Sequence, residues 1–200
     1  MYGIAGLILA AGLASRMGQL KQLLPFGEGT MLEMTTHTLL EAGVREIYVV
    51  LGHEHERIRA QYRYCDRVHL VHNPDYRQGM LTSVRVGVSA MDVDTQAFLM
   101  MPGDCPTAHP RTAQAIVRAY RRTGCRIVRP VCNGRGGHPC LFDYGFSPEI
   151  VQGTLSEGMR TLMRLHAQEV YALPVSDEGI WGDLDTPEQY REALKGQMGR

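Results

Sequence analysis

The 200-residue sequence has no excess charge of either sign and no long hydrophobic run. Lysine plus arginine and aspartate plus glutamate number 21 each, so nothing in the overall charge favours binding to nucleic acid or to a membrane surface. No apolar stretch reaches the roughly 20 residues that a membrane-spanning helix needs. We therefore expect a partner that is neither nucleic acid nor membrane.

The sequence also lacks a cysteine framework. Its five cysteines are odd in number and none are spaced as Cys-x-x-Cys, which disfavours a disulfide scaffold, a zinc knuckle and a thioredoxin-type site. Free thiols are typical of a reducing compartment, so we predict a cytoplasmic protein. A signal peptide is disfavoured as well, because no lysine or arginine precedes the apolar residues 3–14.

Strand-like and helix-like segments alternate along the chain. The predicted strands are short apolar runs at residues 4–9, 46–51, 67–71, 97–101 and 125–131. The predicted helices span residues 31–42, 54–62, 80–91, 112–122 and 157–166, and a last helix starts at Pro187. This order predicts an α/β fold of three layers, α/β/α, in which helices cover both faces of a mainly parallel central sheet. We expect one domain over residues 1–195, a flexible tail at 196–200, and ligands at the carboxyl ends of the strands.

The first candidate site follows the first predicted strand. Bulky residues give way to small ones in Leu9-Ala10-Ala11-Gly12, and two cations follow, Arg16 and Lys21. A loop without large side chains lets a polyphosphate approach backbone N–H groups, and two cations can neutralise two of its phosphates. The stretch has neither the Gly-Lys-Ser/Thr of a Walker P-loop nor the Gly-x-Gly-x-x-Gly of a dinucleotide site. We interpret it as a nucleoside triphosphate site; an ordinary glycine turn after a buried strand is the alternative.

Carboxylates mark two further motifs. Asp104 lies in Pro102-Gly103-Asp104-Cys105-Pro106, directly after a predicted strand, and the two prolines restrict its backbone. Asp183 and Asp185 alternate, so in an extended segment they face the same side, where like charges repel unless a cation lies between them. Both motifs suit Mg²⁺, which prefers one or two carboxylates plus phosphate oxygens. The alternatives are a helix-capping role for Asp104 and, for the pair, a cap beside one solvent-facing aspartate.

Two glycine-containing turns complete the candidate set. Gly79 and Ser83 flank a predicted helix start, where free N–H groups favour an anion or the polar edge of a base. A plain strand-to-helix turn is the alternative there. Gly137-His138-Pro139 ends a glycine-dense turn and precedes an apolar run. It is either a site-forming loop or a hairpin with a structural histidine.

Together these motifs resemble the MobA-like nucleotidyltransferases, and within them the molybdenum cofactor cytidylyltransferases. The matching residues follow the family's order from residue 9 to 187: Leu9-Ala10-Ala11-Gly12, Arg16-Met17-Gly18, Lys21, Gly79-Met80, Ser83, Gly103-Asp104, Pro106, Gly137-His138-Pro139 and Asp183-Leu184-Asp185-Thr186-Pro187. The resemblance implies a Rossmann-like fold and transfer of a nucleotidyl group from an NTP, with release of pyrophosphate.

The resemblance also implies a role for each motif. Leu9, Ala10, Ala11, Gly12, Pro102 and Gly103 would hold the nucleotide, which Gly79 and Ser83 would help to read. Arg16 and Lys21 would bind the triphosphate and act with Asp104 in catalysis. Asp104 and Asp185, with Asp183 as a further candidate, would hold Mg²⁺. Gly137, His138 and Pro139 would shape the pocket for the acceptor.

The first motif bears on the choice of nucleotide. Guanylyltransferases of the family usually show Leu-Ala-Gly-Gly there, whereas this chain has the Leu-Ala-Ala-Gly of the cytidylyltransferases, which implies CTP rather than GTP. The implied acceptor is a molybdopterin-type molecule, the molybdenum cofactor, with a molybdoenzyme receiving the product. Cys105 departs from the family's Gly-Asp-Gln-Pro, which has glutamine at this position. A sugar-phosphate nucleotidyltransferase and a non-enzymatic cofactor chaperone are the alternatives.

Overall fold

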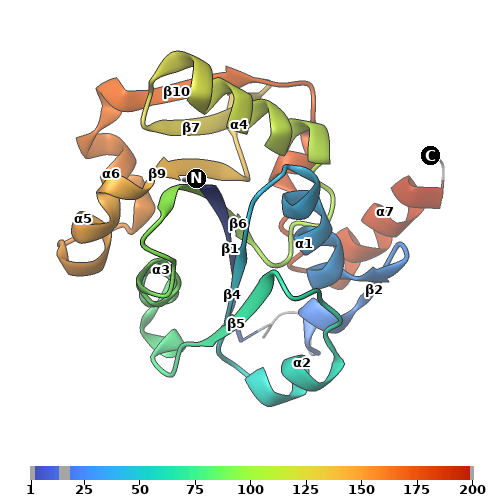
Figure 1. The fold of residues 1–200 in the computed structure, drawn as a ribbon. Coiled ribbons are helices and arrows are strands. Elements are labelled where there is room, and N and C mark those ends of the chain that lie inside the picture. Colours follow the sequence, from blue (N-terminus) through green and yellow to red (C-terminus); the bar gives the residue numbers. More distant parts are fainter. Residues whose placement is uncertain (1–2, 14–18, 199–200) are drawn as a thin grey trace.

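The computed structural model describes residues 3–13 and 19–198, which form a three-layer α/β structure around one central sheet (Figure 1). The strand order is β10-β7-β9-β6-β1-β4-β5, and the short β8 pairs with β7. The strands of this sheet are β1 Gly3–Ala10, β4 Ile47–Leu51, β5 Val68–His72, β6 Thr95–Pro102, β7 Ile127–Cys132, β8 Arg135–Gly136, β9 Cys140–Asp143 and β10 Val170–Pro174.

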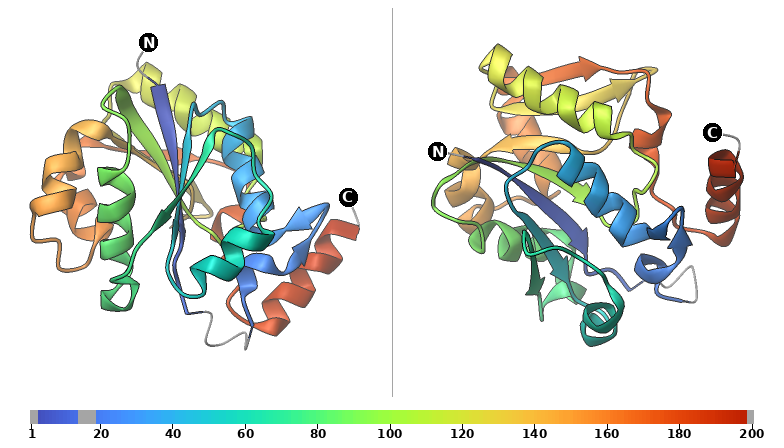
Figure 2. Two further views of the ribbon diagram at one scale, coloured as in Figure 1. Left: turned by 60° about the horizontal axis from the view of Figure 1, so that its bottom comes forward. Right: turned by 45° about the vertical axis from the view of Figure 1, so that its right-hand side comes forward.

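Helices cover both faces of this sheet, as Figure 2 shows from two further directions. One apolar cluster joins α1, α2 and α4 to the sheet, and a second joins α3, α5 and α6 to the opposite face. The helices are α1 Met31–Glu41, α2 His55–Gln61, α3 Met80–Ser89, α4 Pro110–Thr123, α5 Ser147–Gln152, α6 Met159–Leu165 and α7 Pro187–Met198. The predicted α/β fold with three layers is therefore confirmed.

Strand direction brings the predicted motifs to one edge of the sheet. The pairs β1–β4, β4–β5, β1–β6 and β7–β10 are parallel, whereas β9 is antiparallel to both of its neighbours, β6 and β7. Because two antiparallel pairings restore the direction, β7 and β10 run the same way as β6. The carboxyl ends of all these strands except β9 consequently share one edge, where ligands of such folds bind.

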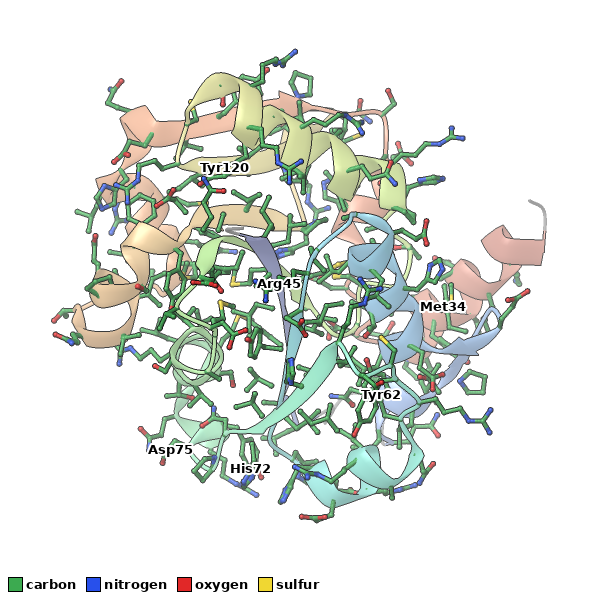
Figure 3. All side chains as sticks on the ribbon, in the orientation of Figure 1. Met34, Arg45, Tyr62, His72, Asp75 and Tyr120 are labelled. Carbon is green, nitrogen blue, oxygen red and sulfur yellow. The ribbon has the colours of Figure 1, made fainter. Side chains whose placement is uncertain are left out.

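Local sequence signals explain where α1 begins and ends. The Thr30 hydroxyl accepts from the Glu33 backbone N–H, and the Glu33 carboxylate accepts from the Thr30 N–H, which is a capping box. At the other end Gly43 takes a φ of +79°, the left-handed conformation that glycine adopts easily after a helix. Tyr62, which follows α2 and is labelled in Figure 3, shares a 2.5 Å hydrogen bond with Thr36 of α1.

The carboxyl-terminal segment packs beside the start of the chain. A small hairpin of β2 Pro25–Phe26 and β3 Gly29–Thr30 lies next to α7 (Figure 1). Leu24, Phe26, Met31 and Leu184 form a separate buried cluster beneath α7. Thr186 and Gln189 hydrogen-bond reciprocally at the start of α7 and so cap this helix. Among the described residues, no helix combines the length and the apolar character needed to span a membrane.

Candidate functional site

Three charged side chains from distant parts of the sequence meet at the carboxyl edge of the sheet. The Lys21 ammonium donates to Asp104 and, at 2.7 Å, to Oδ1 of Asp185, which lie 83 and 164 residues further along the chain. All three side chains are largely shielded, with exposed fractions of 12% for Lys21, 14% for Asp104 and 30% for Asp185. The structure thus brings together a predicted phosphate-binding cation and two predicted metal ligands.

Lys21 is positioned by its neighbour Gln22. Lys21 opens a short 3-10 helix, η1 Lys21–Leu23, that follows the end of β1. The Gln22 side chain is buried and its Nε2 donates to the Ala10 carbonyl at 3.1 Å. This buried hydrogen bond ties η1 to the carboxyl end of β1, and sequence reasoning had not singled out Gln22.

Asp104 is positioned by the close approach of β6 to β1. The Gly103 N–H donates to the Leu9 carbonyl at 2.9 Å, which extends the strand pairing beyond Pro102. A side chain at Gly103 would lie 3.0 Å from the Ala10 methyl group. Glycine therefore allows the two strand ends to meet, and Asp104 comes directly after them.

The segment that carries Asp183 and Asp185 is held by the residue between them. Leu184 is buried, and its N–H donates to the Asp104 carbonyl at 3.1 Å. Asp185 contacts Lys21, while Oδ1 of Asp183 accepts from the Cys105 thiol at 2.8 Å. The alternating pattern thus places an apolar side chain inward and a carboxylate on either side of it near Asp104.

Burial perturbs both partners of the central ion pair. For Lys21, burial disfavours the charged ammonium, but Asp104 and Asp185 together outweigh it and raise the pKa above its ordinary value of 10.5. For Asp104, burial raises the pKa above 3.8, and the charge and hydrogen bond of Lys21 offset this only in part. The pair thus combines incomplete solvation with strong mutual attraction, an arrangement found at functional sites.

The donor set at this edge fits a hard divalent cation. Ligand atoms of Asp104, Cys105 and Asp183 all lie within 4.8 Å of one another. Burial and the nearby carboxylates raise the pKa of the Cys105 thiol well above 9.0, which favours the protonated thiol. The two carboxylates remain as oxygen donors, which is what Mg²⁺ uses in nucleotide sites.

The predicted acceptor loop lies against η5 Glu178–Trp181, which leads into the aspartate segment. The His138 N–H donates to the Ile180 carbonyl at 2.8 Å, and a side chain at Gly137 would come within 2.4 Å of that same oxygen. The hairpin alternative is also present, because Asn133 and Gly134 form the two-residue turn between β7 and β8. The loop of Gly137 and His138 therefore follows a β-hairpin and also contacts η5, which leads to the aspartates of the site.

His138 is a half-buried, neutral histidine. Burial lowers its pKa below 6.5, and this outweighs the opposing charges of Asp183 and Asp104. Its Nδ1 is fully enclosed, and no group in the described part of the chain hydrogen-bonds to it. A buried polar atom without a partner is costly unless a ligand or water satisfies it.

The remaining candidates lie further from the ion pair. The Ser83 hydroxyl is buried and accepts from Nδ2 of Asn73 at 2.9 Å, and Gly79 precedes α3 with a φ of +112°. Gly52 lacks a side chain where both Tyr76 and Ala11 approach, so the segment before Gly79 lies near the first motif. Gly12 follows β1 in the open, and Arg16 is outside the described residues.

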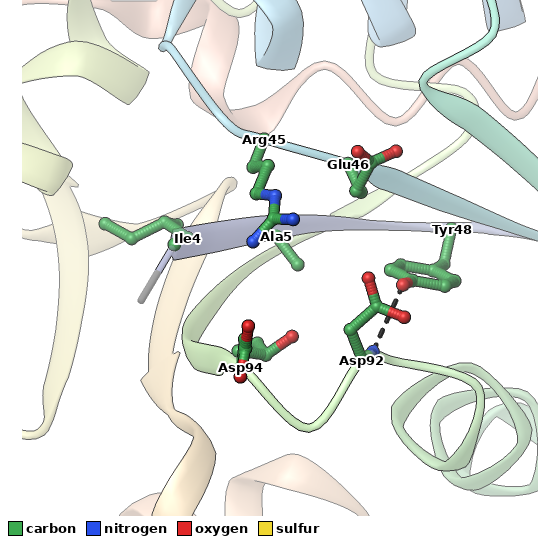
Figure 4. A pocket seen from close by; sticks show the side chains of 9 residues that line it. Ile4, Ala5, Arg45, Glu46, Tyr48, Asp92 and Asp94 are labelled. Atoms are coloured by element: carbon green, nitrogen blue, oxygen red, sulfur yellow. Dashed lines mark hydrogen bonds between the residues drawn. The ribbon is translucent and has the colours of Figure 1, made fainter. Parts of the chain in front are cut away.

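A pocket at the opposite edge of the sheet does not suit the predicted ligand. It is lined by the amino ends of β1, β4 and β6, and Figure 4 shows Tyr48 accepting there from the Asp92 N–H. Its lining contains three carboxylates, those of Glu46, Asp92 and Asp94, and one cation, Arg45. This acidic lining repels a triphosphate, and no carboxyl end of a parallel strand reaches it.

Comparison with known proteins agrees with the geometry. The family model described as the MobA-like NTP transferase domain matches residues 6–170, which include Lys21 and Asp104 but end before Asp183. The molybdenum cofactor cytidylyltransferase of Escherichia coli K12 is 32% identical over 95% of both chains. The nicotine blue oxidoreductase of Paenarthrobacter nicotinovorans is 28% identical over 96% of both chains.

A solved structure shows the same architecture throughout. Rv0371c from Mycobacterium tuberculosis H37Rv aligns with a TM-score of 0.83 and 27% identity, covering 96% of this chain and 98% of that one. Its complex with manganese aligns with a TM-score of 0.78 and 26% identity over the same shares. A relative of this fold has thus been crystallised with a divalent cation.

Proposed function

Because this chain belongs to the MobA-like NTP transferase family, we propose that it transfers the cytidylyl group of CTP to the phosphate of the molybdenum cofactor. Pyrophosphate is the second product. The observation that carries the proposal is the meeting of Lys21, Asp104 and Asp185 at the carboxyl edge of the sheet. A cation and carboxylates in one place are what binding a metal-complexed triphosphate requires.

The reaction is slow without a catalyst chiefly because two anions must meet. The acceptor phosphate attacks the α-phosphorus in line and is already ionised, so no strong general base is required. The protein's task is positioning and charge neutralisation rather than covalent catalysis. Lys21 and Arg16 are proposed to stabilise the charge that develops on the departing pyrophosphate.

Asp104 and Asp183 are the residues that would hold Mg²⁺, with Asp185, which shares Lys21 with Asp104, the next candidate. When bound, the cation would screen the negative charge of the α-phosphate. Cys105 donates to Asp183 and so orients that carboxylate. These ligand assignments, and the dependence on Mg²⁺, belong to the proposal.

The choice of CTP over GTP rests on Ala11. Its side chain is buried and faces Gly52, which has no side chain at this contact. The Ala11 carbonyl accepts from the His53 N–H at 3.2 Å, which fixes the backbone of the motif. The guanylyltransferase pattern has glycine at the position of Ala11. The cytidylyltransferase relative supports the choice of CTP.

Three alternatives give different products. A guanylyltransferase consumes GTP, a sugar-phosphate nucleotidyltransferase releases pyrophosphate with a sugar phosphate, and a cofactor chaperone binds the cofactor without consuming nucleotide. The oxidoreductase relative adds a fourth alternative, which a redox assay with nicotine blue would detect.

The deciding experiment incubates the purified protein with Mg²⁺, molybdenum cofactor and each of the four NTPs in turn. We expect the cytosine dinucleotide of the cofactor, identified by mass spectrometry, together with an equal amount of pyrophosphate. A guanine dinucleotide would correct the base, whereas cofactor binding without nucleotide consumption would support the chaperone. Omitting Mg²⁺ should abolish product formation.

A further inference from the structure

Two arginines near the acceptor loop have no acidic partner in the described part of the chain. Arg129 lies on β7, and neither it nor Arg160 of α6 makes an ion pair or hydrogen bond to any described residue. The Nε atom of Arg129 is buried and has no hydrogen-bond partner there. Arg129 is half-buried, and a half-buried guanidinium group is normally paired with an anion, whereas Arg160 is exposed to solvent.

The sheet places Arg129 beside the acceptor loop. Its register follows the pairs Ile127–Phe142 and Val128–Leu141, so Arg129 lies opposite Cys140, whose thiol pKa its charge lowers in part. Side chains alternate along a strand, and Ile127 packs in the cluster of α3, α5 and α6. Arg129 therefore points to that same face.

Gly136 makes room for the Arg129 guanidinium. A side chain at Gly136 would lie 2.4 Å from Nη2 of Arg129 and 2.8 Å from its Cζ. Gly136 has no positive φ that would itself demand glycine. The lack of a side chain at Gly136 therefore leaves space for the Arg129 guanidinium, which would otherwise have to move.

Arg160 reaches the same loop from α6. Met159 and Leu162 bury α6 against this face, and the chain then enters β10 at Val170, which pairs with Ile127 at the amino end of β7. The first turn of α6 therefore points toward the carboxyl edge. The Arg160 charge adds to the effect of burial in lowering the pKa of His138.

We propose that Arg129 and Arg160 bind and neutralise the anionic phosphate of the acceptor beside the loop that carries His138. This inference rests on the proposed function for the identity of the acceptor. Charge supports the location, because the neighbouring hollow at residues 132–133 and 175–179 contains Asp177 and Glu178 and repels anions. The phosphate would then lie on the other side of His138 from the carboxylates. The pKa of His138 responds to the charges of Asp104, Asp183 and Arg160.

The primary test compares Arg160→Gln with Arg164→Gln. Arg164 lies one turn further along α6, is also exposed, and pairs with Glu157 at 2.9 Å, which makes it a matched control. A charge-assisted hydrogen bond contributes enough binding that its loss should raise the KM for the acceptor by about 10-fold or more. We expect kcat and the KM for CTP to change less than about twofold, and Arg164→Gln to match the wild type. An unchanged acceptor KM, or equal changes for both substrates, would overturn the inference.

The role of Arg129 in binding the acceptor is tested with variants that keep a cationic side chain at position 129. Gly136→Ala should displace the guanidinium and raise the acceptor KM, while Arg129→Lys keeps the charge but loses the forked donor geometry. Melting temperatures report whether each variant folds. A well-folded Gly136→Ala protein with wild-type acceptor KM would contradict the assignment of Arg129.

A binding measurement separates this inference from the proposed function. Inorganic phosphate is titrated into the nucleotide-free protein and followed by isothermal calorimetry. We expect binding to the wild type and to Arg164→Gln, and a loss of about 10-fold or more in Arg129→Lys/Arg160→Gln. Equal binding by the double variant would overturn the inference even if nucleotidyl transfer is observed. Absence of transfer by the wild type would overturn only the proposed function.

Discussion

Two groups of charged side chains lie at the same edge of the sheet. They differ in whether their charges are paired with opposite charges within the protein. In the first, Lys21 is shared between Asp104 and Asp185, and Asp183 accepts from the Cys105 thiol. In the second, Arg129 and Arg160 have no acidic partner among the described residues. One group is internally compensated, and the other offers net positive charge.

The difference indicates which substrate each group meets. The first group has three carboxyl groups for one amine, so a triphosphate needs an accompanying divalent cation to approach it. The second group can accept an anion directly, which suits a phosphate acceptor that arrives without a metal. His138 lies between the groups and stays neutral, so it adds no charge to either.

The largest effect is expected from Asp104→Ala. Removing this carboxylate takes away a proposed metal ligand and the partner of Lys21, and loss of one such electrostatic group typically lowers the rate by about 10²–10³. Pyrophosphate release at saturating substrates measures it. Asp66→Ala, an exposed aspartate before β5, is the control and should behave as the wild type. Wild-type turnover in a folded Asp104→Ala protein would remove Asp104 from the site.

Lys21→Ala should lower the rate by a similar order, about 10²–10³, because the charge on the departing pyrophosphate loses its cation. Because Lys21 and Asp104 bond each other, the double variant should lose little more than either single variant. Rates of the two single variants and the double variant give the coupling directly. Fully multiplicative losses would show that the two residues act independently.

A smaller effect is expected from Gly137→Ala. The new methyl group would overlap the Ile180 carbonyl and push η5, which leads to Asp183, away from the acceptor loop. Overpacking of this kind costs about 1–3 kcal/mol of folding stability, and we expect reduced activity beside it. Urea unfolding measures the stability change. Gly196→Ala, where a side chain meets nothing, should show neither loss.

The pH dependence of stability should report His138. Its pKa is lowered in the folded protein, so the unfolded chain binds a proton that the folded chain resists as the pH falls below about 6.5. Its contribution to stability is therefore present above that pH and lost progressively below it. Unfolding free energies at pH 7.5 and 5.5 should differ more in the wild type than in His138→Gln. Equal differences would mean that His138 is not held neutral.

The smallest and most specific change is expected from Ala11→Gly. Removing this buried methyl group beside Gly52 should relax the preference for cytosine toward guanine while the overall rate changes little. The ratio of kcat/KM for CTP and GTP is the measurement. An unchanged ratio would show that the first motif does not select the base.

The convergence of the motifs could be foreseen from the sequence because parallel strands end at one edge. Lys21 and Asp104 each follow an apolar run, so their meeting required only that β1 and β6 be neighbours. The alternation of Asp183 and Asp185 likewise predicted two carboxylates on the same side of an extended segment. The functional roles of these residues remain predictions.

Other features depend on contacts that no local pattern encodes. Sequence reasoning missed β10, an edge strand of mixed burial that ends at Pro174, and did not foresee the antiparallel insertion of β9. Nothing in the sequence distinguishes Gln22 from a surface glutamine, and its role follows only from its hydrogen bond to the Ala10 carbonyl. In the sequence Arg129 is an ordinary strand residue, and the structure shows that its guanidinium occupies the space that a side chain at Gly136 would fill.

The central claim is that this edge of the sheet joins a nucleotide to an acceptor. The most direct test follows CTP labelled at the α- or the γ-phosphate in the presence of Mg²⁺ and molybdenum cofactor. The account predicts that α-label appears in a cofactor dinucleotide and γ-label in an equal amount of pyrophosphate. Both labels remaining in CTP while the cofactor is bound, or γ-label released as inorganic phosphate, would contradict it.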